Sequence, residues 1–137
     1  MFRVTREIHF CYGHRLLNYD GRCRHLHGHN GRAVITLEGP TLDTRGMVMD
    51  FSDLKRTVGG WIDDTLDHTM LLRKDDPVLS VLQQRGERVH ALDVNPTAEN
   101  IAKLIFEYAQ SQGFPVIEVK LWETENCFAT YEEPRTK

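Results

Sequence analysis

The chain has 137 residues, 40% hydrophobic and 27% charged, a composition typical of globular proteins that gives no reason to expect disorder. We therefore expect a single domain over residues 1–137. The net charge of −3 argues against a nucleic-acid partner, and no apolar run is long enough to cross a membrane. Three cysteines in a chain of this size argue against a disulfide framework and favour a reducing, cytoplasmic location.

Charge is unevenly distributed along the chain. Residues 1–37 carry six arginines against two acidic residues, a balance of +4, and the rest of the chain sums to −7. A basic, histidine-rich segment would suit an anionic small ligand such as a phosphate ester. Solvated arginines would give the same count, and charge alone favours that simpler interpretation.

Hydrophobic periodicity predicts two strands followed by a helix. Residues 2–14 and 29–38 alternate between apolar and polar side chains, as half-buried strands do. A helix capped by Asp50 or Ser52 follows, although Gly59-Gly60 weakens its middle. Its apolar side chains recur at helical spacing: Leu54, Val58, Trp61, Ile62 and Leu66.

The second half of the chain predicts the remaining elements. A short helix over 77–84 and a short strand or loop over 89–92 come first. Asn95-Pro96-Thr97 is a strong helix start, with a capping Asn and Pro in the first turn, and this helix ends near Gly113. Strands over 116–124 and 127–132 complete the order β-β-α-α-β-β. This order predicts an α+β fold, an antiparallel sheet with helices on one face.

The segment from Cys23 to Asn30 is the richest in chemistry. His27 and His29 are two residues apart, so on an extended chain both imidazoles lie on one face. His14 ends the preceding strand and could lie across the hairpin from them. Three imidazoles with an open fourth position form the arrangement of a catalytic zinc site.

Other interpretations of this segment stay open. A His-x-His pair alone is common and often has no function. Cys23 as a fourth ligand would instead make a closed structural zinc site. Imidazole ligands also suit copper, nickel or iron.

Six motifs in order resemble the 6-pyruvoyl-tetrahydropterin synthase and 6-carboxy-5,6,7,8-tetrahydropterin synthase family over nearly the whole chain. The most specific is Cys23-x-x-x-His27-Gly28-His29-Asn30. The others are Phe10-Cys11-Tyr12-Gly13-His14-Arg15-Leu16, Gly46-Met47-Val48-Met49-Asp50-Phe51, Leu66-Asp67-His68, Asn95-Pro96-Thr97-Ala98-Glu99-Asn100 and Trp122-Glu123-Thr124.

The resemblance implies a fold and an assembly. The family fold is the T-fold, or tunnelling fold: a four-stranded antiparallel sheet with two helices on one face. Subunits of the family join their sheets into barrels, usually as a homohexamer, with active sites at subunit interfaces. Barrel closure would also remove exposed sheet edges.

The resemblance also implies a metal centre and a catalytic thiol. His14, His27 and His29 match the family's Zn²⁺ ligands. Cys23 matches the catalytic cysteine, which as a thiolate removes a proton from the substrate side chain. For a single cysteine the alternative is a small buried hydrophobic residue.

Four further residues match family positions. Asp67 and His68 resemble a pair that moves protons, although a histidine at a helix end can simply interact with the helix dipole. Glu123 resembles the pterin anchor, because a carboxylate can accept two adjacent N–H donors; the alternative is an ordinary exposed glutamate. Thr97 is expected to add hydrogen bonds to the same ring.

The implied reaction converts 7,8-dihydroneopterin triphosphate to 6-carboxy-5,6,7,8-tetrahydropterin, with loss of acetaldehyde and triphosphate, on the route to queuosine and related 7-deazapurines. The sister reaction, which gives 6-pyruvoyl-tetrahydropterin by triphosphate elimination, is the alternative. A non-catalytic pterin- or metal-binding module is the second alternative. The sequence departs from the family pattern at Tyr12, usually a small Ala, at the additional His25, and in a long connection over residues 69–94.

Overall fold

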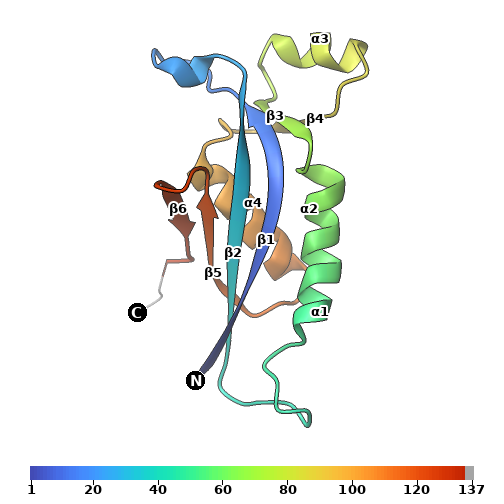
Figure 1. Cartoon of the computed structure of the whole chain (residues 1–137), viewed down its shortest axis with the longest axis vertical. Helices are drawn as coiled ribbons and strands as arrows, with labels where there is room; N and C mark the ends of the chain where they lie inside the picture. Colours follow the sequence, from blue (N-terminus) through green and yellow to red (C-terminus); the bar gives the residue numbers. More distant parts are fainter. Residues whose placement is uncertain (135–137) are drawn as a thin grey trace.

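A curved mixed sheet forms the body of the molecule in the computed structural model, which describes residues 1–134 (Figure 1). Its strand order is β4-β3-β1-β2-β5-β6. The strands are β1 (Phe2–His14), β2 (His27–Gly39), β3 (Thr69–Arg73), β4 (Val89–Leu92), β5 (Val116–Trp122) and β6 (Phe128–Tyr131). The helical segments are η1 (Arg22–Arg24), α1 (Phe51–Leu54), η2 (Lys55–Gly59), α2 (Gly60–Thr65), α3 (Val78–Gln84) and α4 (Ala98–Ser111).

The antiparallel part of the sheet contains the four strands that the sequence predicts. β1 and β2 form a long hairpin in register from Phe2 opposite Gly39 to His14 opposite His27. β5 pairs antiparallel with β2, and β6 pairs antiparallel with β5. The α+β class is therefore confirmed, and these four strands carry the pattern of alternating burial from which they were predicted.

The expected strand number was wrong, because the sheet has six strands; of the two additional ones, β4 coincides with the short strand or loop expected over 89–92. β3 pairs parallel with the end of β1 over only three residues, and β4 pairs parallel with β3. The β3 sequence Thr-Met-Leu-Leu-Arg has no two-residue alternation, so periodicity could not identify it. The 69–94 connection therefore extends the sheet at one edge and carries α3.

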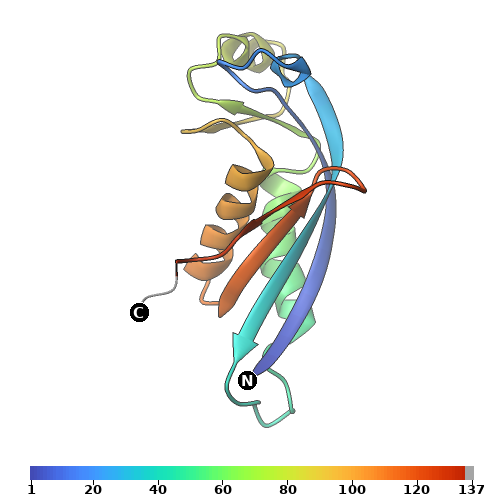
Figure 2. The ribbon, with the colours of Figure 1, turned by 90° about the vertical axis from the view of Figure 1, so that its left-hand side faces the viewer.

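Both long helical segments cover the same face of the sheet (Figure 2). The first runs from α1 through the π-helical segment η2 to α2, with the Asp50 carboxylate accepting from the Ser52 N–H at its start. The predicted apolar positions Leu54, Val58, Ile62 and Leu66 are fully buried. They pack with alternate β1 and β2 residues and with the buried face of α4 in one core.

The start of α4 differs from the expectation. Thr97, not Asn95, is the N-cap, and its Oγ1 accepts from the Asn100 N–H at 3.2 Å. The Asn95 side chain instead makes two 2.9 Å hydrogen bonds to the backbone of Leu17, accepting from its N–H and donating to its carbonyl. Asn95 thereby holds the segment before α4 against the segment after β1.

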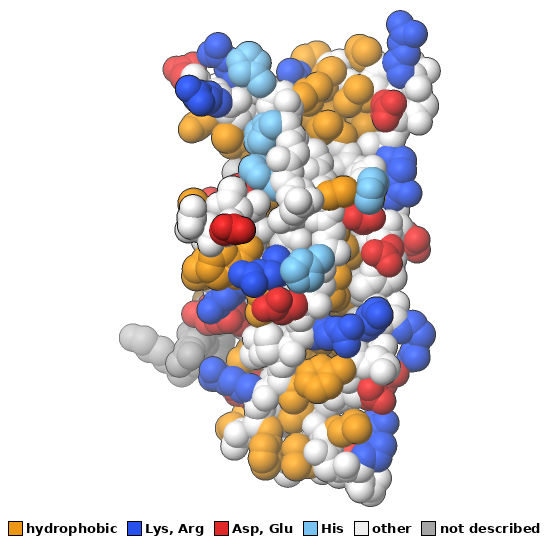
Figure 3. All heavy atoms as spheres, in the orientation of Figure 1, with side chains coloured by type: hydrophobic (Ala, Val, Ile, Leu, Met, Phe, Trp, Pro, Cys, Tyr) orange, Lys and Arg blue, Asp and Glu red, His pale blue; other side chains and the backbone are white. Residues whose placement is uncertain are grey.

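Within residues 1–134, no helical layer covers the other face of the sheet. Polar and charged side chains occupy much of it, including the Arg3–Glu38 ion pair and the Thr5–Thr36 hydrogen bond. Figure 3 views this face, and hydrophobic side chains gather on it near the upper end, beside α3. No helix within residues 1–134 is long and apolar enough to cross a membrane.

Candidate functional site

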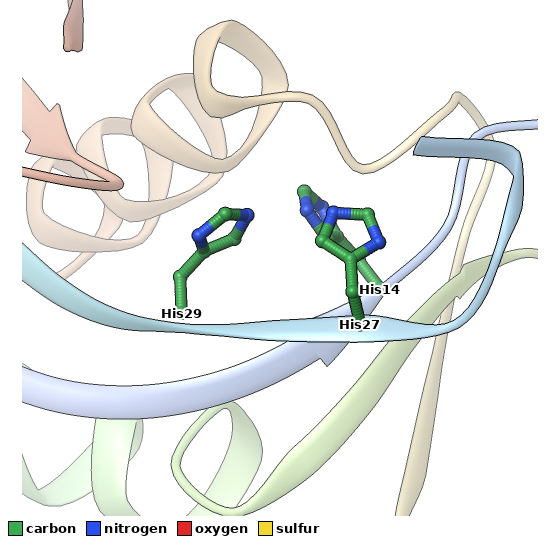
Figure 4. A group of neighbouring side chains, drawn as sticks. All are labelled: His14, His27 and His29. Carbon is green, nitrogen blue, oxygen red and sulfur yellow. The ribbon is translucent and has the colours of Figure 1, made fainter. Parts of the chain in front are cut away.

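Strand register brings the three predicted metal ligands together. His14 lies directly opposite His27 in the hairpin, and His29 lies opposite Tyr12. Because side chains alternate along a strand, all three imidazoles project to the helix-covered face, toward the segment before α4 (Figure 4). Their ring centroids are 4.5, 5.0 and 5.1 Å apart, and one ligand atom from each lies within 4.8 Å of the others.

Backbone carbonyls fix the Nδ1 atoms of two of these rings. His14 Nδ1 donates to the Pro96 carbonyl at 2.6 Å, and His27 Nδ1 donates to the His25 carbonyl at 2.7 Å. In the neutral ring, Nε2 then carries no proton and has a free lone pair. Within residues 1–134, these two Nε2 atoms are the buried side-chain nitrogens or oxygens without a hydrogen-bond partner. A histidine that binds a metal usually donates a hydrogen bond from one ring nitrogen and uses the lone pair of the other nitrogen as the ligand.

The protonation of His14 agrees with this role. The side chain is 3% exposed, and burial lowers its pKa against the opposing effects of the Pro96 hydrogen bond and the Glu123 charge. A neutral imidazole is the form that binds metal. The residues present therefore fit a divalent transition metal such as zinc, held by three nitrogens with a further position open.

Glu123 follows β5 and faces the three histidines. Its Oε1 accepts a 3.1 Å hydrogen bond from the Tyr12 hydroxyl and lies 3.9 Å from His14 Nε2. Its Oε2 lies 3.9 Å from His29 Nε2. Burial and the adjacent Glu123 carboxylate together raise the pKa of Tyr12, so the phenol stays a hydrogen-bond donor.

Thr97 is placed near the same group because it is adjacent in sequence to a residue that contacts it. It follows Pro96, whose carbonyl holds His14, and it caps α4. The structure thus brings five of the predicted site residues to one end of the helix-covered face: His14, His27, His29, Glu123 and Thr97.

Asp67 and His68 form a separate group with Cys11. Asp67 accepts from the Cys11 N–H at 2.9 Å and from His68 Nδ1 at 2.7 Å, and the His68 N–H donates to the Cys11 carbonyl at 2.7 Å. Burial alone would raise the pKa of Asp67, but the hydrogen bonds from Cys11 and His68 hold it below the ordinary value. The carboxylate therefore stays charged and orients the imidazole, as in other acid–base pairs.

His68 also has an unusual backbone. Its φ is 53°, in the left-handed region that L-residues with large side chains rarely adopt. Its imidazole is 76% exposed, whereas its backbone N–H is held by the Cys11 carbonyl. Strained backbone of this kind concentrates at functional sites.

A cavity of about 700 Å³ opens beside this second group. Cys11 and Asn30 belong to its lining, and their side chains lie on the face of the sheet opposite the three histidines; His27 and His29 also line the cavity. Met70, Leu82 and Arg88 also line the cavity. Arg88 donates to the Asp63, Asp64 and Asp67 carbonyls, so β4 is tied to the end of α2.

Cys23 lies outside both groups. It belongs to the exposed η1 turn between β1 and β2, is itself half-buried, and its carbonyl accepts from the Leu16 N–H. Among the described residues, the two groups whose possible ligand atoms all lie within 4.8 Å of one another are the three histidines and Cys11 with Asp67 and His68, and neither includes Cys23. One chain therefore does not join Cys23 with Asp67 and His68.

Sequence reasoning missed two contacts at these sites. Tyr12 is two residues before His14 and Cys11 is three residues before it. Because side chains alternate along a strand, Tyr12 lies on the same face as His14 and Cys11 lies on the open face. That signal was present in the sequence, but the partner of each residue depends on long-range pairing. His25, the additional histidine, contributes its carbonyl to His27 and keeps its imidazole outside the three-histidine group.

Comparison with known proteins identifies the family of this chain. A sequence model of the family described as 6-pyruvoyl tetrahydropterin synthase matches residues 3–134. The chain belongs to the 6-pyruvoyl tetrahydropterin synthase family. Among its relatives, 6-carboxy-5,6,7,8-tetrahydropterin synthase of Rickettsia bellii is 38% identical, with 93% of this chain and 98% of the relative covered. The enzyme of the same name from Haemophilus influenzae is 30% identical, with 97% of this chain and 100% of the relative covered.

Solved structures confirm the T-fold. An uncharacterized protein from Wolinella succinogenes matches with a TM-score of 0.80 at 27% identity, over 97% of this chain and 98% of the other. The 6-pyruvoyl tetrahydropterin synthase of Caenorhabditis elegans matches with a TM-score of 0.73 at 26% identity, over 97% and 96%. The resemblance that the sequence motifs indicate is therefore confirmed at the level of family and fold.

Proposed function

We propose that this protein is a zinc-dependent lyase that converts 7,8-dihydroneopterin triphosphate to 6-carboxy-5,6,7,8-tetrahydropterin, with loss of acetaldehyde and triphosphate. The observation that carries the proposal is the pair of buried, unpartnered Nε2 atoms of His14 and His27 beside His29. The names of the Rickettsia and Haemophilus relatives, which align over nearly the full chain, support the choice of reaction. The reaction would serve the biosynthesis of queuosine and related 7-deazapurines.

His14, His27 and His29 would hold the zinc ion. When bound, zinc supplies a Lewis acid that polarises oxygens of the substrate side chain. The Pro96 and His25 carbonyls keep two of the imidazoles in the tautomer that presents Nε2 to the metal. Nitrogen ligation alone leaves copper, nickel and iron as competitors, which metal analysis would distinguish.

Glu123 would anchor the pterin ring. A pterin presents N–H and NH₂ donors side by side, and a carboxylate can accept from both. Its position 3.9 Å from two histidine nitrogens would hold the ring close to the metal. Thr97, on the segment that holds His14, would add hydrogen bonds to the same ring.

Cys23, Asp67 and His68 would move protons. Cys23, flanked by Arg22 and Arg24, would act as a thiolate that accepts a proton from the substrate side chain. Asp67 orients His68 through Nδ1, which leaves Nε2 to exchange a proton. Because Asp67 and His68 lie on the face opposite the histidines, the complete site would need groups from more than one chain.

We therefore propose a homohexamer with active sites at subunit interfaces, in which neighbouring sheets join into barrels. The physical support is that β4 and β6 end the sheet as edge strands, which unpaired would expose backbone donors and acceptors. We also propose that residues 1–137 form one T-fold domain, since one contiguous core links all major elements of the described chain. The free cysteines among residues 1–134 support a reducing, cytoplasmic location.

A second candidate is the sister reaction, which gives 6-pyruvoyl-tetrahydropterin. The description of the matching family and the Caenorhabditis elegans structure favour it. The two reactions would share the metal centre and the proton-transfer groups, so they are separated by product identity. A non-catalytic pterin- or metal-binding module would need neither Cys23 nor the Asp67–His68 pair.

Metal analysis of variants tests the proposed centre. We expect one zinc per chain in the wild-type protein, loss of zinc in His27→Ala, and full zinc with lost turnover in Cys23→Ala. His25→Ala is the matched control, because its imidazole lies outside the metal group while its backbone carbonyl remains. Loss of zinc in Cys23→Ala would contradict the open catalytic site and support a closed Cys-His-His-His site.

A further inference from the structure

Tyr12 is a buried phenol between the histidine group and Glu123. Its side chain is 3% exposed, and its ring centroid lies 5.2 Å from that of His14 and 5.7 Å from that of His29. Its hydroxyl donates to Glu123 Oε1 at 3.1 Å. The resemblance predicts a small residue at this position, so this contact comes from this chain's own sequence.

The neighbouring strand leaves room for this ring. Gly31 lies beside Tyr12 and Phe10, and a Cβ added to Gly31 would come within 3.0 Å of Tyr12 Cε1 and 3.2 Å of the Phe10 ring. The pair of rings and the glycine therefore fit each other closely. Tyr12 is held in place by packing as well as by its hydrogen bond.

Glu123 lies beside the three histidines but is not one of the residues whose ligand atoms all lie within 4.8 Å of one another. Its two oxygens are 3.9 Å from His14 Nε2 and His29 Nε2. Ligand atoms about 2.0–2.2 Å from one zinc ion are about 3.4 Å apart at a tetrahedral angle. A carboxylate is an ordinary zinc ligand, so a small shift of Glu123 toward the histidines would let it close the open position.

We propose that Tyr12 is a positioning residue that holds the Glu123 carboxylate outside the coordination sphere of the metal. The phenol hydrogen bond keeps Oε1 directed at Tyr12, so the carboxylate remains available to N–H donors of a ligand. The same contact keeps a metal position open for that ligand. This inference rests on the proposed function, because it assumes a metal at the three histidines and a ligand at Glu123.

The test compares Tyr12→Phe, Glu123→Gln and the double variant by zinc affinity and by binding of 6-carboxypterin. Tyr12→Phe keeps the ring and removes only the hydroxyl. A hydrogen bond to a charged group contributes about 1.5–3 kcal/mol, so we expect zinc to bind about 10- to 150-fold tighter and 6-carboxypterin to bind weaker by about the same factor. Adding Glu123→Gln should abolish the gain in zinc affinity.

Tyr131→Phe is the matched control. Tyr131 lies on β6, where it pairs with Val119 of β5 and its ring packs edge-on against Phe106. We expect the control to keep wild-type affinity for both zinc and 6-carboxypterin.

Unchanged or weaker zinc binding by Tyr12→Phe would overturn the inference while leaving the proposed function intact. A gain in zinc affinity that persists in the double variant would also overturn it, because Glu123 would then not be the ligand released. Failure of the wild-type protein to bind zinc would overturn the proposed metal centre itself, and with it this inference.

Discussion

His68 allows a direct test of whether backbone strain is stored beside the Asp67–His68 pair. A residue with a Cβ in the left-handed conformation costs roughly 1–2 kcal/mol, whereas Gly adopts that conformation without steric cost. Substitutions His68→Gly and His68→Ala both remove an imidazole that is 76% exposed, and with it the hydrogen bond to Asp67. The difference between the two variants therefore isolates the backbone cost.

We expect the free energy of unfolding to be larger for His68→Gly than for His68→Ala. The relieved strain of roughly 1–2 kcal/mol is partly offset by the larger entropy of Gly in the unfolded chain, about 0.5–1 kcal/mol. His68→Gly should then be about 0.5–1 kcal/mol more stable than His68→Ala. Both variants should lose turnover, because both lack the imidazole proposed to move a proton.

Urea unfolding at fixed protein and zinc concentration measures this difference. His9 is the matched control, since its side chain is similarly exposed at 73% but lies in the middle of β1. There His9→Gly should be less stable than His9→Ala, as is usual within a strand. A His68→Ala variant as stable as His68→Gly would refute the claim that the left-handed backbone stores strain.

Three further predictions concern the ion pair, the packing and the metal. Asp76 is fully buried, accepts from Arg15 and from the Val78 N–H, and the Arg15 hydrogen bonds hold its pKa below the ordinary value. Asp76→Asn should cost about 2–3 kcal/mol at pH 7, below the usual range for a buried pair because Arg15 is partly exposed. The ion pair stabilises the wild-type protein only while Asp76 is charged, so this cost should begin to fall below pH 3.8, the ordinary Asp pKa, and disappear as the pH passes through the lower pKa of the folded state. An unchanged cost at low pH in urea unfolding would contradict this. Gly31→Ala should destabilise the fold by about 1–3 kcal/mol and weaken 6-carboxypterin binding, because a Cβ would press on the Tyr12 ring. Wild-type stability and wild-type affinity in this variant would contradict the close packing of Gly31 against Tyr12. Zinc at 100 times its dissociation constant should stabilise the protein by about 2.7 kcal/mol against chelator-treated protein, and His27→Ala should abolish that gain in thermal unfolding.

The elements that the sequence predicts are those with regular local patterns. Alternation identifies β1 and β2, and helical spacing identifies the segment buried through Leu54, Val58, Ile62 and Leu66. The same alternation puts His27 and His29 on one face, and the hairpin register completes the group with His14. These features depend on residues close in sequence or on a single strand pairing.

The features that the sequence did not predict depend on contacts distant in sequence. β3 is recognised only by its parallel pairing with the end of β1 and with β4, because five residues carry too little periodicity. Asn95 was expected to cap α4, but the Leu17 backbone takes its side chain, and Thr97 caps the helix instead. The contact of Cys11 with Asp67 likewise spans 56 residues and has no local signal.

The central claim is tested most directly by the products formed from 7,8-dihydroneopterin triphosphate. The zinc-loaded protein should be incubated with this substrate beside its His27→Ala variant, and the products identified by mass spectrometry. The account predicts 6-carboxy-5,6,7,8-tetrahydropterin together with acetaldehyde from the wild-type protein, and neither from the variant. Formation of 6-pyruvoyl-tetrahydropterin without acetaldehyde would contradict the proposed reaction in favour of its sister, and no conversion by folded, zinc-loaded protein would contradict both.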